Sequence, residues 1–236
     1  MTSVFIRYEL RTIEVDAARA FYAKLLGYDR AVIWPLHEQA RARGAMPHWL
    51  GSVGVAGVEQ LDGTAEEFVT RGATVLGPRH PTPDGRHAAV LRDPGGAILG
   101  LTTAAGPSVA PAVEVSWRVL NTNHIADAVR NYETLFGWKI ARDAAVGPYG
   151  TFHEFWWDTL QPRSAGAMAD VAGRMGVHPH WLFFFDVESL DPAVELTRQA
   201  GGTAIDGVVT PTGERVAICE DPQRAAFGLV ERFVTR

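Results

Sequence analysis

Cysteine is almost absent from this chain, since Cys219 is the single cysteine among 236 residues. One cysteine excludes an internal disulfide and a zinc site built from several thiolates, and it fits a reducing compartment. Cys219 falls in an expected strand, which favours a packed thiol over a nucleophile. Long apolar runs are also missing: none approaches the roughly 20 residues that cross a bilayer, and the first ten residues lack the pattern of a secretion signal. We therefore expect a cytoplasmic protein with no membrane partner.

Positive charge is scarce as well. Lysine and arginine total 22 against 27 aspartates and glutamates, which gives a formal net charge of -5. Nucleic-acid binding depends mainly on clustered lysine and arginine, so we expect no nucleic-acid partner. The sequence also lacks a G-x-S-x-G nucleophile elbow, a G-x-x-x-x-G-K-[ST] phosphate loop and an H-E-x-x-H zinc motif. The enzyme classes that depend on those motifs are therefore excluded.

What the chain does contain is an internal repeat. Six residues around a strand and a helix recur at an interval of 110 residues: Leu10 and Leu120, Thr12 and Thr122, Ala18 and Ala128, Tyr22 and Tyr132, Leu25 and Leu135, and Gly27 and Gly137. The sequence MPHWL at residues 46–50 recurs as HPHWL at 178–182, and AVLRDPGGAILGL ending at Leu101 recurs as AICEDPQRAAFGL ending at Leu229. Because the interval grows from 110 to 132 residues before the second motif, the second copy carries 22 extra residues there. Motifs recurring in the same order predict two copies of one fold.

Each copy is expected to alternate strands with helices. Residues 3–12 and 113–122 are rich in β-branched and aromatic side chains, and each leads into a segment with apolar residues at helical spacing. A later helix is predicted to begin at Asp191 as its N-cap, and its counterpart in the first copy at Thr64. Small residues, glycine and proline gather between the copies, so we place two domains at 1–105 and 112–236.

Three features together resemble a known family: an FY or Y before LG or FGW, a PHWL strand start, and a closing DP-x-x-A-x-x-G-L hairpin. They are similar to those of the glyoxalase/bleomycin resistance protein/dioxygenase group, the vicinal oxygen chelate superfamily, and especially of its tandem two-domain glyoxalase-like branch. The resemblance covers nearly the whole chain. It implies an α+β fold of tandem βαβββ modules, forming two domains whose cup-shaped mixed sheets hold a small-molecule ligand.

Metal-bearing members of that superfamily supply His or Gln from the first strand, His from the strand that opens the second module, and Glu from the last strand. At the matching positions this chain has Arg7, Leu50 and Gly100 in the first copy and Trp117, Leu182 and Gly228 in the second. None of these residues is a usual metal ligand, and a divalent site needs three or four N, O or S donors. We therefore expect no metal or other cofactor.

Candidate site residues lie first on the opening strands of both copies. Alternation places Arg7, Glu9 and Arg11 on one face, which the resemblance directs into the cup. A carboxylate between two guanidiniums suits acid–base chemistry and anion binding, so we predict Glu9 as catalytic and both arginines as ligand-binding; a structural salt-bridge ladder is the alternative. The equivalent face of the second copy holds Trp117 and Asn121, predicted to contact a mostly apolar ligand unless they only pack the core.

The extra segment of the second copy, residues 147–160, reads as a strand that the resemblance places over the pocket. His153 is the preferred general base, because imidazole titrates near neutral pH. Tyr149, Phe155 and Trp157 are the predicted ligand contacts. A hydrogen-bonded structural histidine and simple packing of the rings are the alternatives.

Two functions from different classes fit these residues. One is a metal-independent enzyme of lyase, isomerase or cyclase type that acts on an aromatic or polycyclic metabolite; the other is a sequestering protein like the bleomycin-resistance members. A metal-dependent lyase or dioxygenase with ligands displaced to His153, His178 and His180 is a third. For His48 and His180 of the PHW motifs, a structural bond from the ring to the adjacent loop is favoured. Both a monomer and a homodimer remain open.

Overall fold

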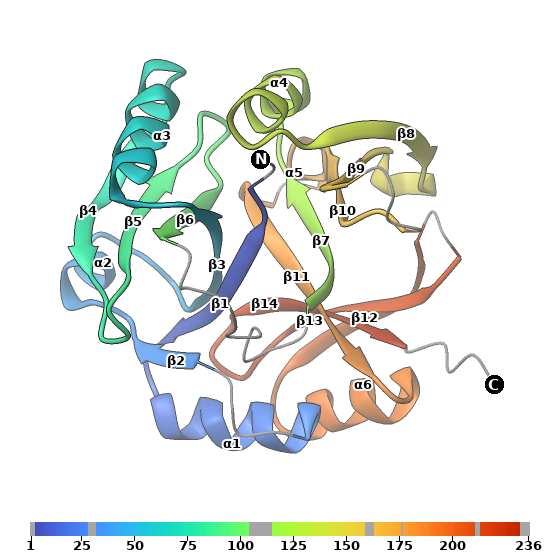
Figure 1. The fold of residues 1–236 in the computed structure, drawn as a ribbon. Helices are drawn as coiled ribbons and strands as arrows, with labels where there is room; N and C mark the ends of the chain where they lie inside the picture. The colour runs from blue at the N-terminus through green and yellow to red at the C-terminus, as the bar shows by residue number, and fades with distance from the viewer. Residues whose placement is uncertain are drawn as a thin grey trace. The chain divides into compact units, whose positions relative to one another are not determined.

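A computed structural model describes residues 3–27, 32–103, 115–158, 163–175, 177–210 and 213–231 (Figure 1). The elements of the first repeat are β1 (Phe5–Thr12), α1 (Val15–Leu26), β2 (Val32–Pro35), α2 (Glu38–Ala42), β3 (His48–Val55), α3 (Val58–Thr70), β4 (Thr74–Pro81), β5 (His87–Arg92) and β6 (Ile98–Thr103). Those of the second are β7 (Val115–Asn121), α4 (Ile125–Phe136), β8 (Lys139–Ala145), the 3-10 helix η1 (Gly147–Tyr149), β9 (Thr151–Trp156), β10 (Gly166–Ala169), α5 (Val171–Met175), β11 (His180–Val187), α6 (Leu190–Gln199), β12 (Thr203–Val209), β13 (Arg215–Glu220) and β14 (Ala226–Glu231).

The strands of each repeat form one mixed sheet. The first sheet has six strands in the order β2-β1-β3-β6-β5-β4, and the second has eight in the order β12-β13-β14-β11-β7-β10-β9-β8. In both, the opening strand has a parallel neighbour, β2 for β1 and β10 for β7. The longer second repeat adds β8 and β9 as antiparallel strands beyond β10. The predicted α+β fold with mixed sheets is confirmed.

Glycine ends the first long helix of each repeat. The caps of α1 and α4 are Gly27 and Gly137, both with φ of 73°, a left-handed conformation that glycine adopts without steric cost. This backbone requirement accounts for the repeated glycine.

Two predicted helix starts are wrong. The helix α3 begins at Val58, well before Thr64, because the fully buried Leu61 belongs to the same apolar stripe as Phe68. The helix α6 has Ser189 rather than Asp191 as its N-cap, since the fully buried Leu190 already lies in its first turn.

The chain divides into two compact units, and each unit takes strands and helices from both repeats. Among the described residues, the first unit holds 3–7, 51–103 and 118–181, and the second holds 8–50, 115–117 and 182–231. Within the first unit α3 packs against α4, and within the second α1 packs against α6. The boundary predicted between domains 1–105 and 112–236 lies outside the described residues, so that division stays a prediction.

The core of each unit is aromatic. In the first unit the ring of Trp138 stacks on Phe155 with centroids 4.5 Å apart and on Tyr132 at 5.1 Å, while Trp181 meets Tyr132 edge-on. In the second unit Tyr22 packs edge-on against Trp49 at 5.1 Å and Phe227 at 5.6 Å. Rings in these geometries add to the stability that comes from burying their area.

A buried hydrogen-bonded chain of three residues recurs in both units. The Trp181 indole donates to the Tyr132 hydroxyl (3.1 Å), which donates to Asp93 Oδ2 (3.0 Å). In the second unit Trp49, Tyr22 and Asp221 form the same chain, with distances of 3.0 and 3.1 Å. In each chain the Trp and Tyr come from one repeat and the Asp from the other. The PHW, FY and DP motifs therefore recur because they make one shared contact.

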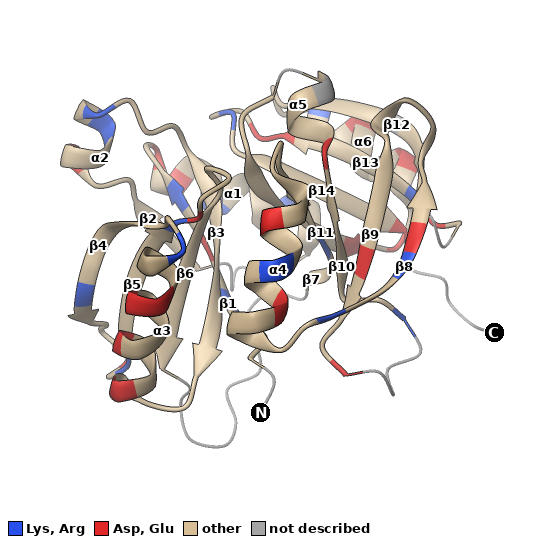
Figure 2. Cartoon of the chain, turned by 90° about the horizontal axis from the view of Figure 1, so that it is seen from above, with Lys and Arg blue, Asp and Glu red and all other residues tan. Residues whose placement is uncertain are grey.

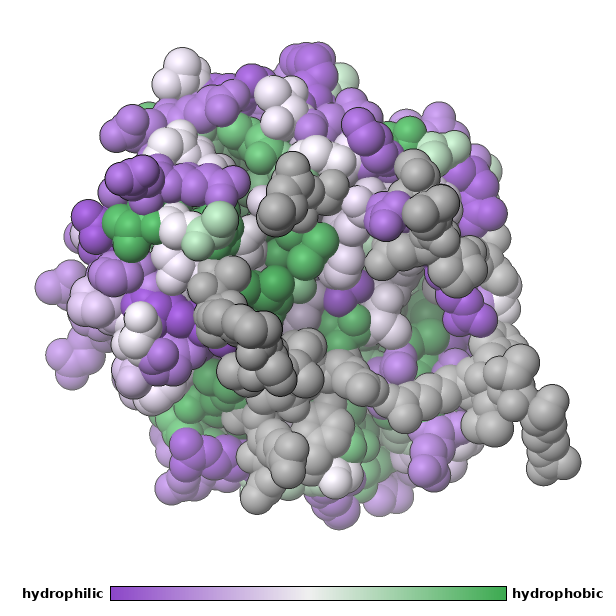
Figure 3. Space-filling view, viewed as in Figure 1, coloured by the Kyte–Doolittle hydropathy of each residue, from purple (hydrophilic) through white to green (hydrophobic). Residues whose placement is uncertain are grey.

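Charged residues lie on the exposed sides of α3 and α4 (Figure 2), whereas Leu61, Phe68, Tyr132 and Phe136 on these helices are buried. Hydrophilic residues cover most of the edge of the face drawn in Figure 3, with apolar patches between them. No helix among the described residues is long and apolar enough to cross a membrane.

Candidate functional site

The three positions that match metal ligands in the second repeat carry Trp117, Leu182 and Gly228, none with a charged side chain. Trp117 is half-buried on β7, and its ring lies 5.5 Å from that of Phe184 at 58°. Phe184 pairs with Gly228 across β11 and β14, and a Cβ on Gly228 would lie 2.2 Å from Phe184 Cδ1. Leu182 is buried. The ring of Phe184 therefore fills the space that a side chain at position 228 would need.

The first repeat closes the matching position with a smaller side chain. Ser52 pairs with Gly100 across β3 and β6, and a Cβ on Gly100 would lie 2.2 Å from the Ser52 hydroxyl oxygen. Leu50 is buried, and Arg7 is occupied by an ion pair with Asp84. No carboxylate can reach a metal ion from either last strand at this position, because glycine stands there in both repeats.

A divalent metal site in either repeat would need a cluster of ligating side chains. Among the described residues, no three His, Cys, Asp or Glu side chains lie together in a way that could hold a metal ion. This includes the displaced set of His153, His178 and His180, in which only the last two rings meet, with centroids 4.9 Å apart.

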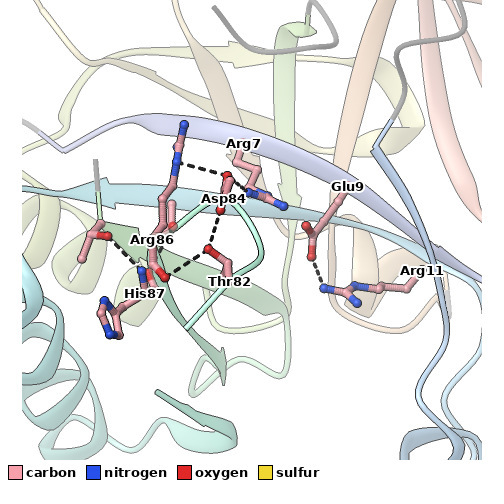
Figure 4. Close-up of polar contacts among 9 residues, drawn as sticks. Arg7, Glu9, Arg11, Thr82, Asp84, Arg86 and His87 are labelled. Atoms are coloured by element: carbon pink, nitrogen blue, oxygen red, sulfur yellow. Dashed lines mark hydrogen bonds and ion pairs between the residues drawn. The ribbon is translucent and has the colours of Figure 1, made fainter. Parts of the chain in front are cut away.

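The charged row predicted on β1 is taken up by ion pairs. Arg7 Nη1 donates to Asp84 Oδ2 at 2.7 Å in the first unit, and in the second unit Arg11 pairs with Glu9, which is only 5% exposed (Figure 4). Arg11 therefore gives the buried Glu9 carboxylate a charged partner on the same strand. These direct contacts support the interpretation of Arg7, Glu9 and Arg11 as members of structural salt bridges.

His153, the predicted general base, lies in a pair with a carboxylate. Its Nδ1 is 2.7 Å from Asp143 Oδ1, and its side chain is 26% exposed. Alternation puts His153 on the same side of β9 as Phe155, whose ring is fully buried against Trp138 and has no surface open to a ligand. The strand therefore presents His153 to the side where α4 packs with the aromatic core.

The opposite side of β9 carries a residue that the sequence did not single out. Glu154 is fully buried, and both of its carboxylate oxygens accept hydrogen bonds from Arg142 Nη2, at 2.6 and 2.7 Å. A bulge between Ile140 and Arg142 shifts the register of β8. Because simple alternation does not include such a bulge, this pairing was not predictable.

Of two more predicted ligand contacts, Trp157 packs against an arginine and Tyr149 lies in a turn. The guanidinium of Arg118 lies 4.4 Å above the ring of Trp157 and donates to the Ala165 carbonyl at 3.1 Å. Tyr149 is half-buried in η1, the turn between β8 and β9. The strand prediction for 147–160 is thus correct for Thr151–Trp156, with a 3-10 turn before it.

Asn121, also predicted to contact ligand, bonds a histidine of the PHW motif. Asn121 Nδ2 lies 3.2 Å from His180 Nε2, and His180 Nδ1 lies 2.8 Å from the His178 carbonyl. A neutral ring with its proton on Nδ1 satisfies both contacts. Desolvation by burial lowers the pKa of His180, which favours that neutral form. His48 makes the same bond to the Met46 carbonyl (2.8 Å), so the predicted ring-to-loop bond is confirmed in both repeats.

Comparison with known proteins places these observations in a family. A model described as "Glyoxalase/Bleomycin resistance protein/Dioxygenase superfamily" matches residues 114–229. The second repeat belongs to this superfamily. The first repeat has the strand order β2-β1-β3-β6, which corresponds to β10-β7-β11-β14 of the second repeat, and it shares the six-residue pattern, PHW motif and DP turn of the second.

Relatives of known name are similar to most of the chain. "Putative glyoxylase CFP32" of Mycobacterium bovis is 26% identical over 256 residues, covering 94% of this chain and 92% of the relative. Two solved structures share the fold at low identity. The Mn(II)-bound glyoxalase from Novosphingobium aromaticivorans has a TM-score of 0.61 at 14% identity, covering 98% of this chain and 81% of that one. The 2,3-dioxygenase LapB from Pseudomonas sp. KL28 has a TM-score of 0.65 at 13% identity, covering 98% and 93%.

Proposed function

We propose that this chain binds a small aromatic or polycyclic molecule through the second repeat and that its function uses no metal ion. The observation that carries the proposal is the packing of the Phe184 ring over Gly228. That ring, with Trp117, replaces the ligand positions on which metal chemistry in the superfamily depends.

The replacement also indicates the kind of ligand. Trp117 is half-buried, so part of its side chain is exposed to solvent. Its ring also packs against the ring of Phe184 on the neighbouring strand. A planar aromatic ligand gains area and ring–ring attraction from such a surface, and few polar groups are needed to orient it.

The test begins with the full chain as purified, without a tag. Elemental mass spectrometry measures bound metal, native mass spectrometry detects a retained organic molecule, and tryptophan fluorescence follows titration with a panel of aromatic compounds. We expect no stoichiometric metal, no effect of a chelator on the melting temperature, and ligand binding that weakens at least tenfold in Trp117→Ala. Trp34→Ala is the matched control, since Trp34 is a partly exposed tryptophan of β2. Stoichiometric metal whose removal lowers the melting temperature would overturn the proposal, as would equal binding by both variants.

For catalysis, the candidate proton-transfer group is His153, because its Nδ1 lies 2.7 Å from Asp143 Oδ1 and 26% of its side chain is exposed. A carboxylate at Nδ1 orients the imidazole and leaves Nε2 to move a proton. Incubation of each compound that binds, followed by mass spectrometry of products, tests this with His153→Gln. Loss of product with binding retained supports an enzyme, with Glu9 as the further candidate group. Binding without product in the wild-type chain supports the sequestering function instead.

A further inference from the structure

A compact cluster of charged residues lies in the first repeat. It consists of Arg7 from β1 and of Thr82, Asp84 and Arg86 from the turn between β4 and β5 (Figure 4). All four residues belong to the first unit. Of these, only Arg7 was predicted from the sequence as a site residue, because 77 residues separate it from the carboxylate that it meets.

The turn holds its side chains in a fixed arrangement. The Thr82 backbone N–H donates to the Arg86 carbonyl at 2.8 Å, and Gly85 N–H donates to the Thr82 carbonyl at 3.0 Å. The Thr82 hydroxyl lies 2.5 Å from Asp84 Oδ1 and 3.1 Å from the Arg86 carbonyl. Gly85 has a φ of 79°, a value that favours glycine. The carboxylate and the guanidinium of this turn are therefore positioned before any ligand arrives.

Asp84 cannot satisfy both arginines equally. Its Oδ2 accepts a 2.7 Å hydrogen bond from Arg7, while Arg86 Nε lies 3.3 Å from the same oxygen and, although buried, makes no hydrogen bond. The side chain of Arg86 is only 12% exposed and that of Arg7 16%, against 43% for Asp84. A buried guanidinium without full pairing is costly, so Arg86, whose buried Nε makes no hydrogen bond, can gain from a second anion.

We propose that Arg86, with Arg7 beside it, forms a binding site for the oxyanion group of a small molecule, an organic carboxylate or phosphate. Two N–H groups of a planar guanidinium match the two oxygens of a carboxylate or phosphate. The contacts of Asp84 with Arg7 and Arg86 restrict the rotation of both guanidinium groups. This site lies in other elements than Trp117 and Phe184, so it does not depend on the function proposed for them.

Calorimetric titration of the full chain tests the site, with inorganic phosphate, phenyl phosphate and benzoate as probes in low-chloride buffer. We expect at least one probe to bind the wild-type chain saturably and Arg86→Gln to lower its affinity at least tenfold. Arg86→Lys keeps the charge but loses the fork, and we expect an intermediate affinity. Arg79→Gln is the matched control, because Arg79 lies on the same hairpin, pairs with Asp62 at 2.9 Å and is 41% exposed; its affinity should equal that of the wild type.

Three results would overturn the proposal: no saturable binding of any probe to the wild-type chain, equal affinities for the wild type and Arg86→Gln, or an equal loss in Arg79→Gln. If Arg86→Gln is too unstable for a calorimetric titration, the affinity of Arg86→Lys is used to test the site instead. Weaker binding by a stably folded Arg86→Lys supports the site, and unchanged binding contradicts it.

Discussion

The two repeats place different chemistry at equivalent positions of the same strands. Where the second has Trp117 packed against Phe184, the first has Arg7 paired with Asp84 and the small Ser52. Both repeats keep glycine on their last strand, each beneath a side chain of the neighbouring strand. Glycine on the last strand is thus common to the repeats, whereas the side chains around it have diverged, one set toward aromatic and the other toward charged surroundings.

The largest expected effect comes from adding one methyl group to each of these glycines. Gly228→Ala places its Cβ against three atoms of the Phe184 ring within 2.5 Å, so the ring or the strand must move. Gly100→Ala meets mainly the Ser52 hydroxyl, which can rotate away. We expect Gly228→Ala to lower the free energy of unfolding by about 3 kcal/mol and Gly100→Ala by about 1 kcal/mol. Urea denaturation of the two variants measures both values.

A double variant shows whether the ring is the cause. Phe184→Ala removes the obstacle, so the cost of Gly228→Ala should shrink when both substitutions are combined, which gives a favourable coupling energy. Equal losses in the free energy of unfolding for Gly228→Ala and Gly100→Ala would contradict the conclusion that Phe184 blocks its glycine more firmly than Ser52 does.

Both repeats contribute to a buried Trp–Tyr–Asp hydrogen-bonded chain, and loss of its tyrosine hydroxyl is the next largest expected effect. Tyr22→Phe and Tyr132→Phe each remove a hydroxyl that links a tryptophan N–H to a buried aspartate. Burial and the adjacent carboxylate raise the pKa of both tyrosines well above the usual value, so the hydroxyls stay protonated and donate. We expect each substitution to cost about 1–3 kcal/mol, because two buried polar groups lose their partner. Thermal and urea unfolding should give similar losses for the pair, and a loss in only one of them would show that the chains are not equivalent.

These chains also show what the sequence could and could not reveal. The repeated Tyr, Trp and Asp were visible as motifs, but their common purpose was not, because Asp221 meets Tyr22 across 199 residues and Asp93 meets Tyr132 across the repeat boundary. Patterns within one element, such as the apolar stripe of α4, depend on local spacing and are readable from sequence.

Pairing between strands accounts for most of what was missed. Alternation predicts His153 and Phe155 on one side of β9, but it cannot say which side Trp138 covers. Likewise, glycine at 228 gives no sign of the ring above it, since that contact depends on the register of β11 against β14. Recognising the family identified the positions that matter, and only the register showed what fills them.

The smallest expected effect is a difference in the pH dependence of stability, and it concerns a contact found at Asn121. The equivalent position in the first repeat is Arg11, which pairs with Glu9, whereas Asn121 bonds His180. Because burial lowers the pKa of His180, the folded chain keeps the ring neutral while the unfolded chain takes up a proton below about pH 6.5. The stability that this neutral ring contributes is therefore present above pH 6.5 and is lost as the pH falls from there toward the folded-state pKa.

A single group of this kind changes the free energy of unfolding by at most about 1.4 kcal/mol per pH unit. Urea denaturation between pH 5 and 8 should show a shallower decline at low pH for His180→Gln than for the wild type. Asn121→Asp places a carboxylate beside Nε2, which favours the charged ring and should also flatten the decline. If all three proteins lose stability in parallel as the pH falls, His180 is not the group that titrates, and the bond to Asn121 does not set its charge.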